Sequence, residues 1–560
     1  MKKTQIFTII CCYIALAATT GCVDNKYDLG KEIDKKWGFG ENGLILPNSN
    51  TSDMHLSQII ELKKNGQLTT DADGNYLFYK KGKSQDETIV CVGYGSICNT
   101  AENNYTYYFR QDSTLEITPK YPELDINTMR FTTSTSPNYK PDRLGEHVRA
   151  LDYVDTPMSI VVEWLDNNIK DFAPYISKIK YSVPSYYVLE DENDLVATNM
   201  ATNRFGYHVI RCKGVDFNAA LAEGEVASYN NETGQISFKG DIKMDCFIDY
   251  AYMNLYDTIS NPYINIRTTV GSLTTDRVTG RFEKRENVEM EPITFDDMPD
   301  LIKNEEVVID IDNPIVRLTI DNEVPARALI NATVKAYRNG TETTRLNIGE
   351  AYGTDSIKFE GKKTQTVWIS RKPTEIPDSV SDNIVVDNII DIMRIMPDKI
   401  NIDGWAHTDS SQVVTMGLNY KYKVYPTYEL VAPLVIGKNM KLVYIKETDD
   451  LHSKLDKLEI NSLTMTASIT NTIPLDLTTT LKAIDTQNRE IKDIVLTQAQ
   501  IIKGLSDTDI TLTIVGKPED FQKLDKLELK AYAESSEVLA GQTLNENQAL
   551  RLENIKITIK

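Results

Sequence analysis

Alternating apolar and polar residues dominate the chain beyond about residue 40. Asn-Gly, Asp-Gly and Asn-Glu-Thr-Gly turns separate many of the alternating segments, which include 76–79, 235–240, 316–320, 463–469, 510–514 and 527–532. A period of two is typical of a strand with one buried face, and such turns join antiparallel neighbours. The pattern therefore predicts a mainly β protein built of tandem antiparallel β-sandwich domains.

Helical patterns are short and few. They occupy residues 53–64, 216–223, 387–396 and 497–503, and a Gly or Pro follows each one closely. Because glycine and proline commonly end helices, we expect a few short helices there, at the edges of the sheets.

One segment recurs at a fixed spacing. Residues 311–325 match residues 460–474 without a gap, and both copies run into Asn-x-x-Pro, at Asn322 and at Asn471. Proline cannot donate to a strand ladder, so each strand must end and turn at this motif. We expect two related β-sandwich domains, at 280–428 and 429–560. Two further β-rich domains are expected before them, at 41–150 and 151–279.

The first 22 residues read as a lipoprotein signal. Lys2 and Lys3 precede an apolar stretch at 6–18, which is too short to span a membrane, and Gly21 then precedes Cys22. A small residue before the cysteine suits cleavage and acylation, whereas Thr19 departs from the usual aliphatic residue. We expect a signal peptide at 1–21, lipid on Cys22 and a tether at 22–40. The alternative is ordinary secretion, with Cys22 incidental.

The residues after Cys22 carry a resemblance. Cys22-Val-Asp-Asn-Lys-Tyr-Asp-Leu29 is similar to the C-x-D-x-x-Y-D-L mature start of a group of Bacteroidetes lipoproteins, and Asp71–Tyr76 resembles their D-x-D/N-G-N-Y hairpin. That group has no assigned activity, so the resemblance implies an outer-membrane compartment and a lineage but no chemistry. Only Asp24 and Asp28 form an acidic signal after the cysteine, which leaves the periplasmic or surface-exposed side open.

Charge narrows the choice of partners. The 560 residues include 61 Lys and Arg against 81 Asp and Glu, for a formal charge of -20. Phosphate backbones require clustered basic side chains, so nucleic acid is not an expected partner. No later segment approaches 18 consecutive apolar residues, and the lipid is therefore the one expected membrane contact.

Four cysteines remain beyond the expected anchor: Cys91, Cys98, Cys212 and Cys246. An exported protein can form disulfides, and the spacing favours pairing Cys91 with Cys98 and Cys212 with Cys246. Buried free thiols are the alternative. Metal binding is not expected, because neither pair has C-x-x-C spacing and no histidine lies close.

Catalytic motifs are missing from the sequence. It contains no nucleophile elbow, HExxH, P-loop or Gly-rich dinucleotide turn, and its five histidines are scattered. Two acidic clusters, at 190–194 and 71–75, read as turns in preference to calcium loops. We therefore expect neither an enzyme nor a cofactor. A pair of carboxylates supplied by distant strands would be invisible in sequence, so a surface glycan hydrolase stays as an alternative.

Tyrosines supply the candidate binding residues. Several of the 29 tyrosines are spaced to share one face of a strand: Tyr105 with Tyr107, Tyr250 with Tyr252, and Tyr420 with Tyr422. Exposed rings on a rigid sheet offer a large amphipathic area for sugars or proteins, although cross-strand packing is the competing interpretation. The sequence predicts a lipid-anchored envelope protein that binds or scaffolds an envelope protein or a glycan. A structural subunit of a surface assembly is a further alternative.

Overall fold

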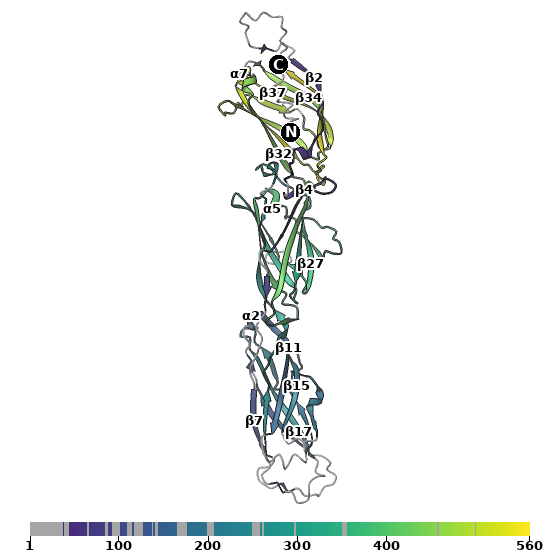
Figure 1. Ribbon diagram of the computed structural model, residues 1–560, viewed down its shortest axis with the longest axis vertical. Coiled ribbons are helices and arrows are strands. Elements are labelled where there is room, and N and C mark those ends of the chain that lie inside the picture. The colour runs from purple at the N-terminus through teal and green to yellow at the C-terminus, as the bar shows by residue number, and fades with distance from the viewer. Residues whose placement is uncertain are drawn as a thin grey trace, which may run out of the picture.

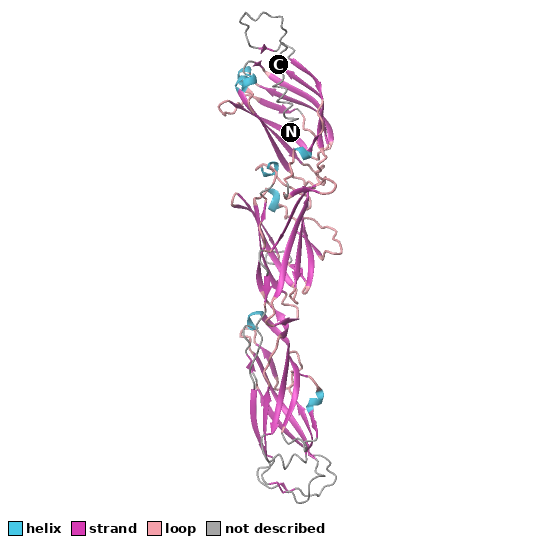
Figure 2. Cartoon of the chain, in the orientation of Figure 1, coloured by secondary structure: helices cyan, strands magenta, loops and turns pink. Residues whose placement is uncertain are grey.

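The protein is a stack of three β-sandwich modules placed end to end (Figure 1). The lower module comprises residues 101–283, the middle module 66–91 with 284–435, and the upper module 37–63 with 436–560. Strands form most of the regular structure, and the helices are short (Figure 2). The computed structural model describes residues 37–38, 44–63, 66–84, 88–91, 101–108, 115–116, 127–136, 138–139, 144–164, 176–198, 206–248, 258–259, 263–295, 298–349, 356–455, 458–498 and 500–560.

The lower module packs two antiparallel sheets. One sheet contains β7 (Ala101–Tyr108), β11 (Val148–Trp164), β13 (Tyr187–Leu189), β15 (Tyr207–Asp216), β19 (Tyr263–Val270) and β20 (Arg277–Phe282). The other contains β9 (Asn127–Thr135), β10 (Asn138–Tyr139), β12 (Ile176–Ser182), β14 (Val196–Thr198), β16 (Val226–Tyr229) and β17 (Ile236–Ile248). Smaller elements are β8 (Leu115–Glu116), β18 (Thr258–Ile259), α2 (Leu144–His147) and η3 (Glu192–Leu195).

The middle module repeats this two-layer arrangement. Its larger sheet contains β4 (Leu68–Thr70), β5 (Tyr76–Lys83), β6 (Thr88–Val90), β23 (Ile315–Asn322), β27 (Lys363–Ser370), β28 (Asp382–Val385) and β31 (Tyr422–Pro433). The facing sheet contains β21 (Arg285–Glu289), β22 (Ile293–Thr294), β24 (Ala328–Arg338), β25 (Thr341–Ile348), β26 (Ile357–Phe359) and β29 (Lys399–Thr408). The helices are α4 (Asp300–Lys303) and α5 (Asp391–Arg394), and β30 (Val414–Gly417) pairs with β20 of the lower module.

The upper module contains both the first and the last strands of the described chain. One sheet contains β2 (Leu44–Ser49), β3 (Met54–His55), β34 (Ser462–Asn471), β36 (Val495–Gln498), β37 (Ser506–Val515) and β39 (Ala549–Ile559). The second sheet contains β32 (Lys441–Thr448), β35 (Asp476–Asp485) and β38 (Leu524–Glu534). The remaining elements are β1 (Trp37–Gly38), β33 (Leu458–Glu459), η1 (Leu56–Gln58), α6 (His452–Leu455) and α7 (Pro518–Lys523).

Seven strands follow the same order in every module. One sheet reads β15-β11-β19-β7 in the lower module, β27-β23-β31-β5 in the middle and β37-β34-β39-β2 in the upper. The facing sheet reads β9-β17-β12, β21-β29-β24 and β32-β38-β35. The three modules therefore share one sandwich topology. The sequence match reveals two of them, the middle and the upper, and the strand order reveals the lower module as the third.

The copies are nested along the chain. Residues 44–108 supply the first of the seven shared strands to each module in turn, from upper to lower, and these strands are β2, β5 and β7. Each pairs antiparallel with the one of the seven shared strands that comes last in its module, β39, β31 or β19. The expected linear domains 41–150 and 151–279 therefore do not describe the sheets, because strands from 41–150 enter all three modules. Periodicity reports that a segment is a strand and not which distant strand it joins.

The two segments that match in sequence occupy equivalent places. Asn322 ends β23 and Asn471 ends β34, and both side chains are buried. Each amide nitrogen donates to two backbone carbonyls, and each amide oxygen accepts from the backbone N–H two residues later. The carbonyls belong to Ala326 and Glu360 (both 3.2 Å) in the middle module, and to Leu475 and Lys503 (both 3.0 Å) in the upper.

Continuous hydrogen bonding fixes the junction of the lower and middle modules. Strand β20 pairs with β11 of the lower module and also with β30, which lies between β29 and β31 of the middle module along the chain. Beside it, the Thr408 hydroxyl donates to the carbonyl of Phe282 at 2.9 Å and accepts from the backbone of Lys284 at 3.0 Å. One connected cluster of buried apolar side chains extends through both modules and reaches the upper one.

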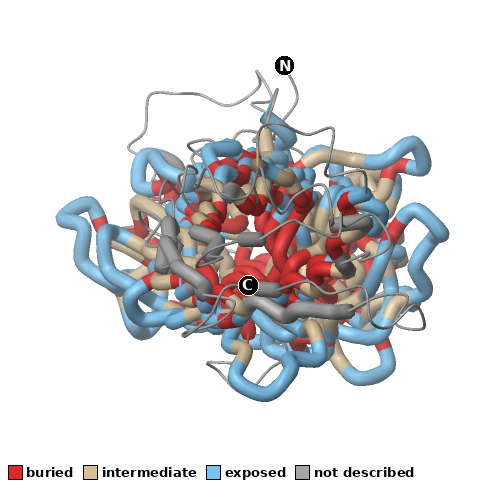
Figure 3. The backbone as a smooth tube through the Cα atoms, turned by 90° about the horizontal axis from the view of Figure 1, so that it is seen from below, coloured by how far each residue is buried: buried red, intermediate tan, exposed pale blue. Residues whose placement is uncertain are grey.

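A buried ion pair fixes the junction of the middle and upper modules. The side chain of Asp310 is 1% exposed and accepts from Arg371 Nη1 at 2.8 Å. It also accepts from the backbone of Asn439 at 2.9 Å, while its own carbonyl accepts from Gly437. Charges removed from water are tolerated where they are paired and hydrogen-bonded in this way. Viewed along the long axis, buried residues lie toward the centre and many of the exposed ones in loops at the rim (Figure 3).

The helix predictions are mostly wrong. Only α5 forms an α-helix inside a predicted segment, and 53–64 keeps a single 3-10 turn, η1. Residues 216–223 contain the last residue of β15 followed by turn and loop, and most of 497–503 is strand end and loop. Segments this short gain little from helical propensity, so strand pairing and turn hydrogen bonds decide their conformation.

Candidate functional site

An open cleft of about 870 Å³ lies on the outward face of the larger sheet of the middle module. Strands β5, β23, β27 and β31 form its floor, and residues 377–380 form one wall. The inward positions of these strands fill the core, so the alternate positions are left to face the cleft. On β31, for example, Tyr428 and Leu430 are buried whereas Thr427 and Glu429 point outward.

Strand register aligns four chemically distinct side chains in one row across the floor. Arg317 of β23 is directly opposite Trp368 of β27 on one side and Glu429 of β31 on the other. Lys81 of β5 follows as the next partner of Glu429. The Arg317 guanidinium lies 5.2 Å from the centre of the Trp368 ring, within cation–π range. Trp368, Arg317, Glu429 and Lys81 are called the charged row below.

Glu429 is the hub of the charged row. Its carboxylate accepts from the Tyr79 hydroxyl at 2.7 Å, from Arg317 Nη1 at 2.9 Å and from Lys81 Nζ at 3.1 Å. Its side chain is 24% exposed, so water reaches it from the cleft. These three contacts hold Tyr79, Arg317 and Lys81 around the Glu429 carboxylate, which reduces the conformational freedom lost when a ligand binds.

The same contacts keep Glu429 ionised. Partial burial by itself would raise the pKa of this carboxyl, but the hydrogen bonds from Tyr79, Lys81 and Arg317 outweigh it and lower the pKa to about 2. The pKa of Lys81 is raised by its hydrogen bonds to Tyr79 and Glu429. A general acid needs a proton to give near neutral pH, so Glu429 is unsuited to that task.

Threonines make the next row of the floor. Thr319 and Thr366 share a hydroxyl–hydroxyl hydrogen bond of 2.8 Å, and the Thr427 hydroxyl donates to the Thr319 carbonyl at 3.3 Å. Hydroxyl groups both donate and accept, so this row offers adaptable polar contacts beside the aromatic and charged ones. The cleft thus combines a tryptophan, fixed charges and hydroxyls on a rigid sheet.

Gly82 shapes the edge of the cleft. A side-chain carbon at this position would lie 2.4 Å from the Tyr428 ring, so only glycine lets β5 approach that ring. Tyr428 is buried beneath the floor, and burial with the nearby Glu291 raises its pKa to about 12. The ring of Tyr428 therefore supports the floor as a neutral side chain.

The predicted pair Tyr420 and Tyr422 lies elsewhere, at the base of the middle module. Their ring centres are 4.5 Å apart in a tilted arrangement beside a second open cleft. Tyr422 is buried and its hydroxyl accepts from the backbone of Gly417 at 2.8 Å, which makes it a structural residue. Tyr420 is 56% exposed and remains available for contact. Sequence spacing correctly brings the two rings together, but only one of them faces solvent.

The other predicted tyrosines give less information. Tyr105 and Tyr107 lie on β7 opposite Ile266 and Ile264, and their side chains are outside the described part. Tyr250 and Tyr252 also lie outside the described residues, as do Cys22 and Cys98. The expected lipidation and the pairing of Cys91 with Cys98 therefore stay predictions.

The predicted Cys212–Cys246 disulfide is not formed. Both are buried free thiols, Cys212 on β15 and Cys246 on β17, which belong to opposite sheets of the lower module. Burial raises the pKa of each thiol to about 12, with a smaller contribution from a nearby aspartate. They therefore pack as small apolar side chains and are poor nucleophiles.

The acidic cluster at 71–75 forms a turn, as predicted, whereas residues 190–194 do not: they run into the 3-10 helix η3, between β13 and β14 of opposite sheets. The Asp71 carboxylate accepts from the backbones of Asp73 and Asn75, both at 2.9 Å, and Gly74 takes a left-handed φ of 82°. Asp191 caps η3 at its N-terminus through the backbone of Asn193. Among the described residues, His, Cys, Asp and Glu side chains form no group suited to holding a metal ion. No described helix is long and apolar enough to cross a membrane.

Comparisons with known proteins give no family. No protein-family model matches the chain, and neither does any curated protein. Among solved structures, a "putative secreted protein" from Parabacteroides distasonis is 16% identical, over 50% of this chain and 90% of that one, with a TM-score of 0.37. A structure of infectious bursal disease virus, Gx strain, is 9% identical over 85% of this chain and 83% of that one, with a TM-score of 0.15. These scores are too low to carry an argument about function.

Sequence reasoning missed the charged row. Its members come from four strands between residues 81 and 429, and only the register of the folded sheet places them together. The available signal is that Arg317, Trp368 and Glu429 each occupy an outward position of an alternating strand. That signal marks many other polar residues as well.

Proposed function

We propose that this chain is a lipid-anchored protein of the cell envelope that acts as a non-catalytic binding rod, with a glycan as the ligand of the cleft. The observation that carries the proposal is the charged row, where Trp368 lies beside a fixed guanidinium–carboxylate–ammonium array. Sugar rings present apolar C–H faces that stack on tryptophan and hydroxyls that need donors and acceptors. The threonine row next to Trp368 supplies further polar contacts.

The state of Glu429 favours binding over hydrolysis. Hydrolysis of a glycosidic bond needs one carboxylic acid that is still protonated near neutral pH and a second carboxylate about 5 to 10 Å away. With a pKa of about 2, Glu429 has lost its proton, and Tyr79, Arg317 and Lys81 already occupy its oxygens. A surface glycan hydrolase would have to place its acids elsewhere.

The place of the anchor suits a rod that projects from a membrane. Cys22 precedes β1 by about fifteen residues, and β1 pairs with β33 of the upper module. A lipid on Cys22 would attach next to that module, so the lower module would form the end far from the membrane (Figure 1). The hydrogen-bonded junctions support a rod that holds the cleft at a fixed distance from its anchor.

A glycan array tests the binding proposal. The purified chain 22–560 carrying Cys22→Ser is expected to bind a subset of oligosaccharides, and Trp368→Ala is expected to abolish that binding. Trp405→Ala is the matched control, because Trp405 faces outward on the opposite sheet and also stacks with an arginine, Arg285, at 4.1 Å. Binding that survives Trp368→Ala, or is lost equally with Trp405→Ala, would contradict the proposal.

Metabolic labelling tests the anchor separately. A palmitate analogue is expected to label the full chain in cells and to leave Cys22→Ser unlabelled. Protease treatment of intact cells then separates surface display from the periplasmic side. An unlabelled wild-type chain that keeps Met1 would contradict the anchor without affecting the glycan result.

A further inference from the structure

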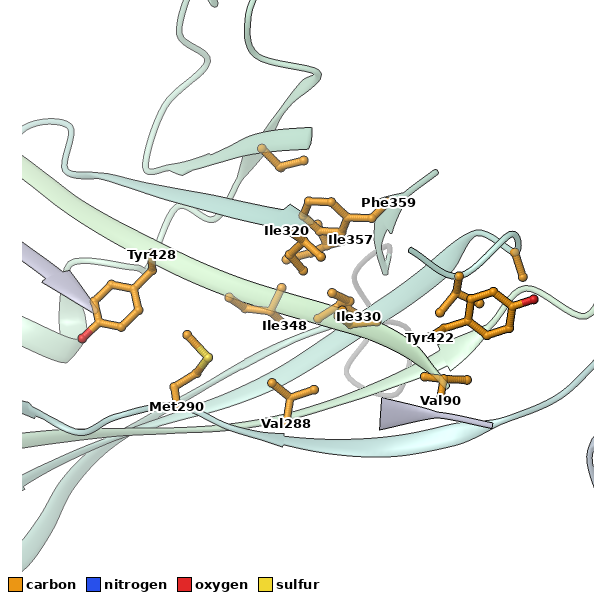
Figure 4. Close-up of a cluster of buried hydrophobic side chains, with 14 of the residues drawn as sticks. Val90, Val288, Met290, Ile320, Ile330, Ile348, Ile357, Phe359, Tyr422 and Tyr428 are labelled. Atoms are coloured by element: carbon orange, nitrogen blue, oxygen red, sulfur yellow. The ribbon is translucent and has the colours of Figure 1, made fainter. Parts of the chain in front are cut away.

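The middle module encloses a second, separate space between its two sheets. This cavity has a volume of about 180 Å³, and almost all of its lining side chains are aliphatic. Figure 4 shows part of this apolar interior, where Val288, Ile330 and Ile348, three of the lining residues, are labelled. It lies on the inner side of the sheet whose outer face carries the charged row, and among the described residues Tyr428 is the one side chain that lines both spaces.

Small residues on the facing sheet create the space. Ala332 of β24 is directly opposite Gly404 of β29, and Ile330 is opposite Ala406 in the same ladder. All four line the cavity. Two packed sheets stand about 10 Å apart, a gap that interdigitating side chains normally fill. Alanine and glycine at adjacent inward positions cannot reach across it.

The upper module provides an internal comparison. In the repeat, the position that corresponds to Ala332 is Leu481 of β35, and its cross-strand partner is Leu529 of β38. Both leucines line the space between the sheets of the upper module, which is only about 50 Å³. The same sandwich is thus well filled where the chain has a leucine pair and is hollow where it has alanine and glycine.

The polar end of the cavity carries no net charge. Lys284 and Glu286 line the cavity near the lower module, and their ammonium and carboxylate groups pair at 3.1 Å. The rest of the wall is apolar apart from His407, Thr408 and Tyr428, so few polar groups are available to hold water. An apolar cavity of about 150 Å³ is known to stay dry and to bind a ligand such as benzene.

We propose that the middle module binds a small uncharged apolar molecule, an aromatic ring or a short branched alkyl chain, between its two sheets. The volume matches a ligand of this size, and the aliphatic lining gives it dispersion contacts that water cannot replace. The paired Lys284 and Glu286 disfavour a ligand with a formal charge. The site is independent of the glycan cleft, and either one can fail without the other.

Titration of the chain 22–560 carrying Cys22→Ser with benzene and with indole tests the inference, with calorimetry and ligand-observed NMR as readouts. One saturable site is expected for at least one of the two probes. Ala332→Leu, which copies the upper module, is expected to weaken binding at least about tenfold. Ala406→Leu fills the cavity from the neighbouring strand and serves as a second variant if the first misfolds.

The control is Leu329→Met, on the outward face of β24, and it should bind as the wild type does. Hydrogen-exchange protection of β23 and β24, which does not depend on glycan binding, should be unchanged in every variant and reports that the middle module is folded. Absence of saturable binding of both probes by the wild-type chain, or equal affinity in the folded Ala332→Leu variant, overturns the inference.

Discussion

Asn471 makes in the upper module the three backbone hydrogen bonds that Asn322 makes in the middle module. Both amides are buried at the end of a strand, where the following proline stops the ladder. A buried backbone group without a partner is costly, so the amide replaces the strand partner that the turn removes. This explains why the repeat keeps asparagine three residues before proline.

The first prediction follows from these hydrogen bonds. Asn471→Leu should lower the free energy of unfolding of the upper module by about 2 to 4 kcal/mol, because two carbonyls and one N–H become unsatisfied. Hydrogen exchange is the suitable measurement, since separate modules can open separately. Amides of β34 and β35 should lose protection while those of β23 and β24 keep theirs. Equal protection in the variant and the wild type would show that the amide is dispensable.

A second prediction concerns the loss of stability at low pH, where Glu429 becomes protonated. The folded pKa of Glu429, about 2, is below its ordinary value of 4.5, so its ionisation stabilises the fold above about pH 4.5. That stabilisation, on the order of 2 kcal/mol for this partly exposed group, should disappear as the pH falls from about 4.5 towards 2. The difference in urea unfolding between wild type and Glu429→Gln should shrink over this window. A difference that stays constant with pH contradicts the assigned contacts.

The packing of Leu481 between the two sheets of the upper module gives a third prediction. Leu481→Ala reproduces the alanine of the middle module and should cost about 2 to 5 kcal/mol in the free energy of unfolding of the upper module, as expected for a cavity-forming change. Thermal unfolding with hydrogen exchange measures the effect, and Lys482→Ala on the exposed face of β35 is the control. A cost similar to that of the control would mean that Leu481 does not fill the interior.

The buried pair at the upper junction gives a fourth prediction. Arg371→Met leaves Asp310 buried without its cation, which should cost about 3 to 5 kcal/mol locally. Because the pair lies between modules, the loss should appear as bending: small-angle scattering should show a broader spread of molecular lengths. Lys438→Met removes an exposed pair with Glu537 nearby and is the control. A profile unchanged by Arg371→Met would show that other contacts at this junction, such as the isolated β-bridges Val308–Lys441 and Ile311–Ile436, keep the rod straight.

Short-range sequence patterns predicted the fold class well. Period-two segments became strands, the cluster that begins at Asp71 became a turn, and the Asn-x-x-Pro match marked two real copies. The limits of the modules could not be read in this way, because β2, β5 and β7 each join a strand more than 150 residues away. Self-comparison also missed the lower module, whose strands keep the order but not the residues of the other two.

The candidate site depended even more on long-range register. The tyrosines were chosen by spacing along one strand, and burial then removed Tyr422 from the exposed surface. Glu429 had no distinguishing neighbour in sequence, since its three partners lie on other strands, Arg317 on β23 and both Tyr79 and Lys81 on β5. Spacing along the chain also gave no guide to the cysteines, since Cys212 and Cys246 lie on strands of different sheets and both stay free.

The most direct test of non-catalytic glycan binding is a titration followed by recovery of the ligand. The oligosaccharide that binds best should be titrated calorimetrically into the wild-type, Trp368→Ala and Trp405→Ala chains, and its mass determined after prolonged incubation. If the charged row binds a glycan without cleaving it, Trp368→Ala alone should lower the affinity at least about tenfold, and the oligosaccharide should be recovered at full length. Shortened products that disappear when a carboxylate is replaced would contradict it and identify the protein as a hydrolase.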